Sequence, residues 1–381
     1  MQVISTTEEL QEFSARMAKA TFVAVDTEFM REKTYWPILC LIQAAFDGEE
    51  AIIDPISSDL DLTPFLDALR EPGLTKVFHA ARQDIEIFYK LMGTVPSPIF
   101  DTQIAAMACG FGDQIGYEPL MRTLLGAKID KGSRFTDWSR RPLSDAQLTY
   151  AMSDVTYLRE AYPILNQQLE QKERVHWVAS EMDALLDENL YFTAPDTAWK
   201  RLKLKNVRPR DLGVVIELAK WREETAQQRD IPRSRVLKDE AIYDLARSKP
   251  KSNDDLKRSR SLANGFEKSK FAPDLLNAVR DGTKRDADTL PEINNDERRK
   301  PPTDVVELLK VLLKRQCGEY NVAQKLVANM SDLEEIALDS NADVPALKGW
   351  RRELFGEMAL RLKSGEIALH LKNNNVELLE L

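Results

Sequence analysis

The sequence of 381 residues has few of the side chains that bind zinc or form disulfide bonds. Its cysteines and histidines are Cys40, Cys109, Cys317, His79, His176 and His370. None of them are grouped at the spacings of a zinc site, and the cysteines lie far apart in the chain. We therefore expect neither a structural zinc ion nor disulfide bonds. Cys40 and Cys109 have apolar neighbours and are interpreted as small core residues.

Long hydrophobic runs are also missing. No window approaches the roughly 18 consecutive apolar residues that are needed to cross a bilayer. The chain starts with a short apolar run and a helix-capping pattern at residues 5–8, without the basic start and apolar stretch of a signal peptide. These absences predict a cytoplasmic protein with no membrane partner.

Acidic residues outnumber basic residues in the whole chain, but the reverse holds in one segment. The 53 basic and 62 acidic residues give a net charge of −9. Residues 200–285 hold 23 basic and 13 acidic side chains, a net charge of +10, which leaves −19 for the rest. A cationic segment in an acidic protein is compatible with nucleic-acid binding, and equally with a solvated helical surface.

Short β-rich runs dominate the first part of the chain. They cover residues 22–29, 38–45, 50–54 and 76–80. Helical spacing follows at residues 84–93, 102–110 and 144–169, and in the last of these Met152, Val155 and Leu158 recur on one side. Strands followed by helices predict an α/β domain, to which we assign residues 1–195.

The rest of the sequence contains helical patterns only, and we find no convincing strand after residue 197. Residues 281–302 are polar and contain three prolines, which is typical of a connection between domains. The amphipathic patterns on its two sides predict two all-α domains, residues 205–285 and 300–381.

Paired carboxylates stand near the end of the first strong strand, in VAVDTEF. Asp26 and Glu28 are two residues apart, so the period of a strand places both on one face, about 7 Å apart. Two such anions at a partly buried strand end repel each other unless a cation or a proton intervenes, and a hard divalent metal is a natural partner. The alternative is an ordinary acidic strand end in solvent.

Three further residues have both a structural and a functional interpretation. Asp84 begins the helical run after the strand KVFHA, where a helix cap explains it well, and Asp101 is expected to cap the next helix. Tyr150 and Asp154 are four residues apart, so on a helix they share one face at the edge of the apolar stripe. A structural hydrogen bond explains that pair equally well.

The order of these pieces resembles a known family. VDTEF, HAARQD and YAMSD look like the three exonuclease motifs of the tyrosine-bearing branch of the DEDD superfamily. DWSRRPLSDAQLTYAMSDVTYL is very similar to the ribonuclease D signature, and the likeness extends over roughly residues 3–168. The resemblance implies a ribonuclease H-like α/β fold with a mixed five-stranded sheet. It also implies 3′ to 5′ hydrolysis of RNA with release of nucleoside 5′-monophosphates.

Site residues follow from the resemblance position by position. It implies that two divalent cations are held by Asp26, Glu28, Asp84 and Asp154, with Tyr150 beside the attacking water. The chemistry agrees, because two metal ions can activate water and stabilise a leaving oxygen. An all-carboxylate site favours Mg²⁺ or Mn²⁺. Phe29, Met30 and His79 are weaker candidates for substrate contacts, and a core role is as plausible for Phe29 and is favoured for His79.

The helical regions carry a second resemblance. Residues 209–279 are similar to the HRDC domain that ribonuclease D shares with certain helicases, and residues 303–371 are assigned to a second, HRDC-like domain by position and helicity. The chain lacks the G-x-x-x-x-G-K phosphate loop of a helicase. The expected partner is RNA with a free 3′ end, such as a transfer RNA precursor, bound by a monomer whose basic segment grips the phosphate backbone.

Competing interpretations remain open at this point. A DNA 3′ exonuclease would use the same metal site, since no residue is an evident sensor of the ribose 2′ hydroxyl. An inert RNA-binding scaffold is disfavoured because all five site residues are present. A dinucleotide-binding enzyme would need a glycine-rich turn after the first strand, which this sequence lacks.

Overall fold

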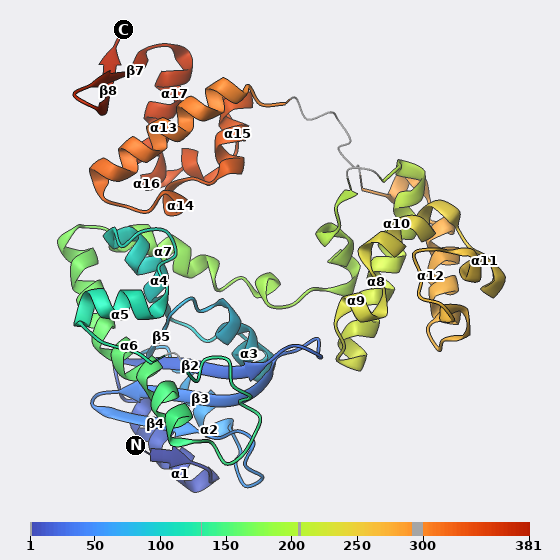
Figure 1. Ribbon diagram of the computed structural model, residues 1–381, viewed down its shortest axis with the longest axis horizontal. Helices are drawn as coiled ribbons and strands as arrows, with labels where there is room; N and C mark the ends of the chain where they lie inside the picture. Colours follow the sequence, from blue (N-terminus) through green and yellow to red (C-terminus); the bar gives the residue numbers. More distant parts are fainter. Residues whose placement is uncertain (1, 131, 205–206, 292–299) are drawn as a thin grey trace. The chain divides into compact units, whose positions relative to one another are not determined.

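The computed structural model describes residues 2–130, 132–204, 207–291 and 300–381 (Figure 1). The chain divides into two compact units. The first unit comprises Met1–Glu28, Cys40–Asp187 and Glu297–Leu381, and the second comprises Phe29–Leu39 and Glu188–Asp296, as far as these ranges are described. This division differs in two ways from the three successive domains that the sequence predicts, residues 1–195, 205–285 and 300–381. The C-terminal helices belong with the sheet, and a short early segment belongs with the middle helices.

A mixed six-stranded sheet forms the centre of the first unit, in the order β1-β4-β3-β2-β5-β6. The strands are β1 (Gln2–Ile4), β2 (Phe22–Met30), β3 (Ile38–Phe46), β4 (Glu49–Ile53), β5 (Thr75–Phe78) and β6 (Ile99–Asp101). β3 and β4 are antiparallel, whereas β2 runs parallel to β5. The ribonuclease H-like class is confirmed, with one strand more than the five that the resemblance implied. The edge strands β1 and β6 have three residues each, too few for a clear alternation.

Helices pack around this sheet. They are α1 (Thr7–Met17), α2 (Thr63–Ala68), α3 (Arg82–Met92), α4 (Thr102–Cys109), α5 (Tyr117–Leu125), α6 (Asp145–Gln171) and α7 (Val175–Ala184). α6 begins at a capping box in which Ser144 and Gln147 satisfy each other's backbone groups. Its predicted stripe, Met152, Val155 and Leu158, is buried, and the helix packs against β4 and β5. This packing fixes the rotation of α6 about its axis.

The C-terminal part of the first unit is mainly helical. Its elements are α13 (Thr303–Tyr320), α14 (Gln324–Val327), α15 (Met330–Leu338), η7 (Pro345–Leu347), α16 (Gly349–Arg351), η8 (Arg352–Gly356), α17 (Glu357–Ser364), β7 (Ile367–Lys372) and β8 (Asn375–Glu380). The rings of Trp177 and Trp350 stack with centroids 4.4 Å apart, and Arg351 pairs with Glu181. These contacts join the C-terminal helices to α7, which explains why they belong to the same unit as the sheet.

A β-hairpin closes the chain and corrects the expectation of no strand after residue 197. β7 and β8 pair antiparallel from Ile367 to Glu380. Asn373 and Asn374 form the two-residue turn with φ values of 51° and 62°, the left-handed conformation that favours asparagine and glycine in tight hairpins. The strands are half-exposed and alternate weakly, so their pattern resembles that of a loop.

The second unit is helical, as predicted. Its main elements are η2 (Pro195–Arg201), α8 (Leu212–Arg229), α9 (Arg233–Val236), α10 (Asp239–Ser248), α11 (Asn253–Arg258) and α12 (Ala272–Lys284). α8 and α12 cross at two glycines: a Cβ on Gly213 would lie 2.5 Å from the Gly282 carbonyl oxygen. A larger residue at this crossing would force the two helices apart.

Residues 29–39, the connection between β2 and β3, form part of this unit's core. Tyr35 is buried among its apolar residues. The Tyr35 hydroxyl hydrogen-bonds to Glu223 and lies 2.6 Å from Arg233 Nη2. The Asp230 carboxylate accepts from the backbone N–H groups of Tyr35 and Trp36, at 3.0 and 2.9 Å. The segment that directly follows Glu28 is therefore held by a buried polar network.

Two expectations from the sequence concern disulfide bonds and membrane-spanning segments. Cys40, Cys109 and Cys317 are all buried and none is in a disulfide bond. None of the helices in the described ranges has both the length and the apolar character that crossing a membrane requires.

Candidate metal and active site

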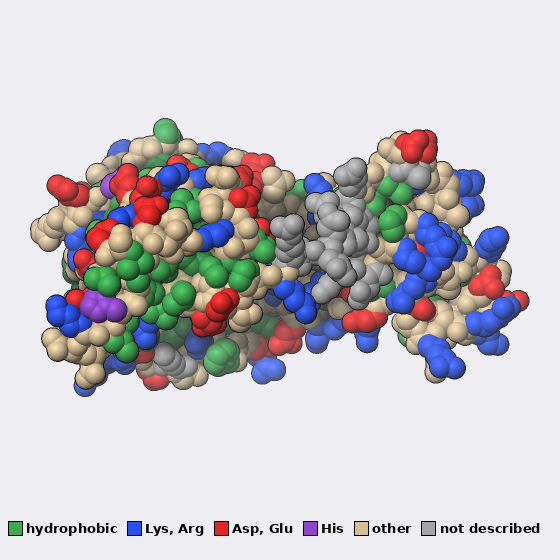
Figure 2. All heavy atoms as spheres, turned by 90° about the horizontal axis from the view of Figure 1, so that it is seen from above, with side chains coloured by type: hydrophobic (Ala, Val, Ile, Leu, Met, Phe, Trp, Pro, Cys, Tyr) green, Lys and Arg blue, Asp and Glu red, His purple; other side chains and the backbone are tan. Residues whose placement is uncertain are grey.

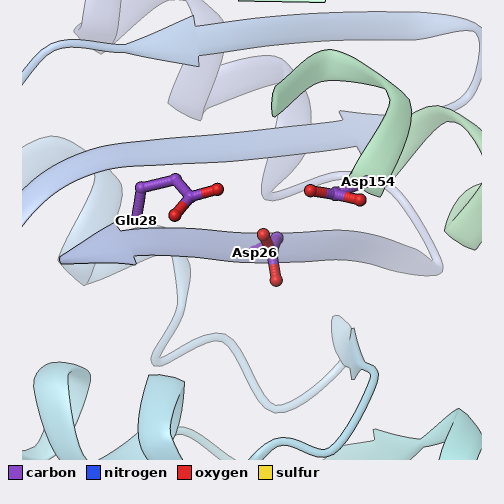
Figure 3. Close-up of side chains that lie close together, drawn as sticks. All are labelled: Asp26, Glu28 and Asp154. Carbon is purple, nitrogen blue, oxygen red and sulfur yellow. The ribbon is translucent and has the colours of Figure 1, made fainter. Parts of the chain in front are cut away.

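Three carboxylates converge beside the central strand. Asp26 and Glu28 project from the same face of β2, as the strand period predicted, and Asp154 approaches from α6 (Figure 3). One carboxylate oxygen from each lies within 4.8 Å of the others. Asp154 is buried, whereas Asp26 and Glu28 are half-buried. A single cation can therefore contact all three side chains with only small adjustments.

Asp84 stands next to this group rather than within it. It lies in the first turn of α3 and is buried. The helix begins after Ala81 without a side-chain cap, so Asp84 is not its N-cap residue. Instead, Asp84 Oδ1 accepts a hydrogen bond of 2.5 Å from the hydroxyl of Thr27, the residue between the two carboxylates of β2. Asp101, by contrast, caps α4 as expected, because its carboxylate accepts from Gln103 N.

The carboxyl groups of this site have raised pKa values. Burial is the main cause at each residue, and repulsion between the carboxylates adds to it at Asp26, Glu28 and Asp154. The pKa of Glu28 is raised to about 8, and those of Asp84 and Asp154 to about 7. The pKa of Asp26 is also well above its ordinary value. Full ionisation near neutral pH is therefore costly unless a cation compensates the charge.

Oxygen-only ligands determine which cations fit. Carboxylates are hard donors that suit Mg²⁺, Mn²⁺ or Ca²⁺ better than zinc or copper. Within the described residues, no cysteine or histidine takes part in the group. The donor set therefore fits a hard divalent ion.

Tyr150 lies one helical turn before Asp154, and a hydrogen bond between their side chains lowers the pKa of the carboxyl. Burial, followed by the charge of Asp154, raises the pKa of the Tyr150 phenol well above its ordinary value. The hydroxyl is therefore a neutral donor rather than a base. The buried ring of Trp138 lies 6.1 Å from that of Tyr150, centroid to centroid, and restricts its movement.

The weaker sequence candidates are placed differently. Phe29 and Met30 continue β2 beyond Glu28 and are half-buried. The His79 Nδ1 atom is 3.0 Å from the Thr102 hydroxyl, and its ring packs on Tyr117. These contacts favour the structural interpretation of His79.

Tyr117 is a supporting residue that sequence analysis missed. Its hydroxyl lies 2.6 Å from the carbonyl oxygen of Asp154 and 2.8 Å from that of Ser153, to which it donates. It therefore anchors the backbone of α6 at the third carboxylate. Only the folded chain shows this contact, because Tyr117 is far from Asp154 in sequence.

Arg134 is the second residue that sequence analysis missed. The pKa values of Glu28, Asp154 and Tyr150 are raised mainly by burial, and the positive charge of Arg134 offsets part of that rise. The side chain is exposed, and its guanidinium carbon lies 5.1 Å from the ring centre of Phe135, which is itself 90% exposed. A hydrogen bond of 3.1 Å from Gln147 Nε2 to the Thr136 hydroxyl ties this turn to the start of α6. An adjacent arginine and phenylalanine just before the signature DWSRRPL would have been the clue.

Two family models match the chain. A model described as 3′–5′ exonuclease matches residues 1–170, and one described as HRDC domain matches residues 211–279. The first match contains every proposed site residue, and the second lies within the helical second unit.

Similar proteins extend the likeness to the full length. The chain is 48% identical to ribonuclease D of Nitrobacter hamburgensis over 376 residues, which cover 99% of this chain and 98% of that protein. It is 45% identical to ribonuclease D of Bartonella henselae, over 100% of this chain and 94% of that one. The crystal structure of Escherichia coli RNase D, an exoribonuclease involved in structured RNA processing, superposes with a TM-score of 0.83 at 28% identity, covering 96% and 98% of the two chains.

Proposed function

Because the chain belongs to the ribonuclease D family and is a 3′ to 5′ exoribonuclease, we propose that the reaction takes place at the acidic cluster between β2 and α6. The proposed metal ligands are Asp26, Glu28, Asp84 and Asp154. The observation that carries this proposal is the convergence of three carboxylates within 4.8 Å. The Thr27 hydrogen bond that orients Asp84 supports including the fourth.

The proposed ions are Mg²⁺ or Mn²⁺, since carboxylate ligands suit both. When bound, two such ions supply charge neutralisation at the phosphorus and a water of lowered pKa. The protein positions the reacting groups. Asp84 keeps its orientation through Thr27, and Tyr117 holds the backbone that carries Asp154.

Tyr150 is proposed to orient the attacking water through its hydroxyl. Its raised pKa keeps the phenol protonated at neutral pH, so it donates a hydrogen bond and does not remove the proton. Attack on the last phosphodiester releases a nucleoside 5′-monophosphate and leaves a new 3′ hydroxyl on the RNA. Repeated turnover then shortens the RNA from its 3′ end.

Arg134 is proposed to contact the phosphate of the terminal nucleotides, since its charge reaches Glu28, Tyr150 and Asp154. The exposed ring of Phe135 offers a face on which a base can stack without sequence preference. Phe29, at the end of β2, is assigned a similar stacking role, with Met30 next to it.

The natural substrate is proposed to be a small structured RNA with a free 3′ end, including transfer RNA precursors. The involvement of the E. coli relative in structured RNA processing supports this class. The +10 charge of residues 200–285 supports contact between the second unit and the phosphate backbone. We propose that the enzyme acts as a monomer in the cytoplasm, where such precursors are made.

The test is hydrolysis of a 5′-labelled single-stranded RNA in the presence of Mg²⁺ or Mn²⁺. Asp26→Asn and Asp154→Asn should abolish the ladder of products shortened from the 3′ end. Asp59→Asn, an exposed aspartate outside the cluster, is the matched control and should leave the ladder intact. A DNA copy of the oligonucleotide should be cut weakly. Activity that persists in both cluster variants would show that the site lies elsewhere.

A further inference from the structure

The second unit contains a cavity of about 520 Å³ whose walls are rich in basic side chains. It lies where η2, α8, α9 and α10 meet. Four basic residues line it, together with the acidic Asp239 and Glu240: Arg201, Arg222, Arg233 and Lys238. Lys and Arg side chains are also frequent on the surface of this unit in Figure 2. The cavity therefore lies within the segment whose charge distinguishes it from the rest of the chain.

Arg222 is the most buried basic residue of this cavity. Its side chain is only 6% exposed. Its Nη1 atom donates to Leu237 O and, at 2.5 Å, to Asp239 Oδ1. Its Nε atom is buried without a hydrogen-bond partner in the described parts of the chain. The cavity does not reach this Nε atom, so Arg222 contributes the positive charge of its guanidinium to the cavity wall rather than this particular donor.

Arg233 adds a second oriented guanidinium. Its Nε and Nη2 atoms donate to the carboxylate of Glu223, and Nη2 also lies 2.6 Å from the Tyr35 hydroxyl. Its Nη1 atom has no hydrogen bond to any residue that the structure describes. The buried network therefore fixes the plane of the guanidinium and leaves one nitrogen for a ligand.

Arg201 and Lys238 supply charge that the unit does not neutralise. Neither forms an ion pair within the described ranges, whereas Asp239 is paired with Arg222. Arg201 donates a hydrogen bond of 3.1 Å to the Thr193 hydroxyl, which also accepts from Arg233. Thr193 thus brings the two arginines to one side of the cavity.

The chemistry of these walls identifies the ligand class. Guanidinium groups bind phosphate through paired N–H donors, and an ammonium group adds a point charge. A volume of 520 Å³ falls within the range of small-molecule sites and leaves room for the sugar next to a phosphate. We propose that the cavity binds a phosphate group of the RNA substrate. The proposal rests on the RNA-binding role of the second unit proposed above.

The test uses the full-length protein in chelator, so that RNA is bound but not cut. The variant Arg201→Gln/Lys238→Gln removes the two cavity charges that lack ion pairs and leaves the buried Arg222 and Arg233 networks in place. The matched control is Lys257→Gln/Arg260→Gln, which removes two exposed charges of the same unit outside the cavity. Free inorganic phosphate serves as the first probe and a structured RNA with a 3′ tail as the second.

With the first probe, phosphate should raise the melting temperature of the wild type and the control more than chloride does at equal ionic strength, since a ligand of the native state stabilises it. The cavity variant should lose this difference. With the second probe, the slope of log Kd against log salt should fall by about one unit for each phosphate contact removed in the cavity variant. A phosphate-specific shift and a salt slope that are both unchanged would overturn the proposal.

Three further outcomes separate the possible failures. If phosphate stabilisation disappears but the RNA slope stays the same, RNA is overturned as the source of the phosphate, and a free phosphate or nucleotide takes its place. If a full-length variant that combines the cavity and control substitutions also leaves RNA affinity and its salt slope unchanged, the proposed RNA-binding role of the second unit fails with it. If the slope falls in the control alone, RNA binds this unit outside the cavity, and only the cavity proposal is overturned.

Discussion

The hydroxyl of Thr27 donates a hydrogen bond of 2.5 Å to the carboxylate of Asp84, linking the central strand to the first turn of α3. Thr27 lies between Asp26 and Glu28 on β2. The contact therefore ties the orientation of Asp84 to the strand that carries two other proposed ligands.

Replacing Thr27 tests this link. Thr27→Val keeps the shape of the side chain but removes the donor, so Asp84 loses a bond to its charged form. Hydrogen bonds to charged groups contribute about 1.5–3 kcal/mol, so kcat/KM should fall about tenfold or more, with weaker metal binding measured by titration calorimetry. Thr27→Ser retains the hydroxyl and should stay near wild type. Equal activity of the Val and Ser variants would show that the hydrogen bond does not orient a functional group.

Tyr150→Phe tests the proposed orientation of water. The ring and its packing on Trp138 remain, and only the hydroxyl that hydrogen-bonds to Asp154 is lost. A hydrogen bond to a charged group contributes about 1.5–3 kcal/mol, so we expect kcat to fall about 10- to 100-fold. Metal affinity should change little because the carboxylates stay. Unchanged turnover would refute the assignment.

Arg134→Gln tests the arginine that sequence analysis missed. Loss of a charge-assisted contact with phosphate should lower kcat/KM for RNA about 10- to 100-fold, the equivalent of about 1.5–3 kcal/mol. Arg140→Gln is the matched control, because Arg140 lies on the same loop, is exposed and pairs with Asp137. If the two variants have equal activity, the contact between Arg134 and the substrate is ruled out.

Site residues that lie close together in the sequence could be predicted from it, whereas contacts between residues far apart in the sequence could not. The pairing of Asp26 with Glu28 and of Tyr150 with Asp154 follows from the periods of a strand and a helix, which are local properties. The role of Asp84 required knowledge of Thr27, more than 50 residues away. Arg134 acts from a loop without regular structure, where no period indicates which way a side chain points.

The division of the chain was hard to predict for the same reason. The pattern of residues 29–39 indicates a connection between strands, and nothing local predicts that Tyr35 enters the core of a helical unit formed by residues almost 200 positions later. Likewise, the stacking of Trp177 on Trp350 joins helices that the sequence pattern assigns to separate domains. Such contacts between distant segments fix domain boundaries, and helical periodicity does not reveal them.

The raised pKa values predict how stability of the metal-free enzyme depends on pH. A carboxyl group whose pKa is higher in the folded than in the unfolded state stabilises the fold while it is protonated. This contribution is complete below the unfolded pKa of about 4 and is lost as pH rises through the folded values, about 7 for Asp154 and about 8 for Glu28. In chelator, the melting temperature should therefore fall between pH 5 and pH 8.5.

Metal ions should reverse this trend, because they bind the ionised ligands and compensate their charge. The gain in melting temperature on adding Mg²⁺ or Mn²⁺ should thus increase from pH 5 to pH 8.5. Glu28→Gln removes one of the titrating groups and should flatten the pH dependence in chelator, whereas Glu12→Gln, an exposed control on α1, should not. A metal-free wild type whose melting temperature is as high at pH 8.5 as at pH 5 would show that the cluster ionises without cost, which its burial and mutual repulsion argue against.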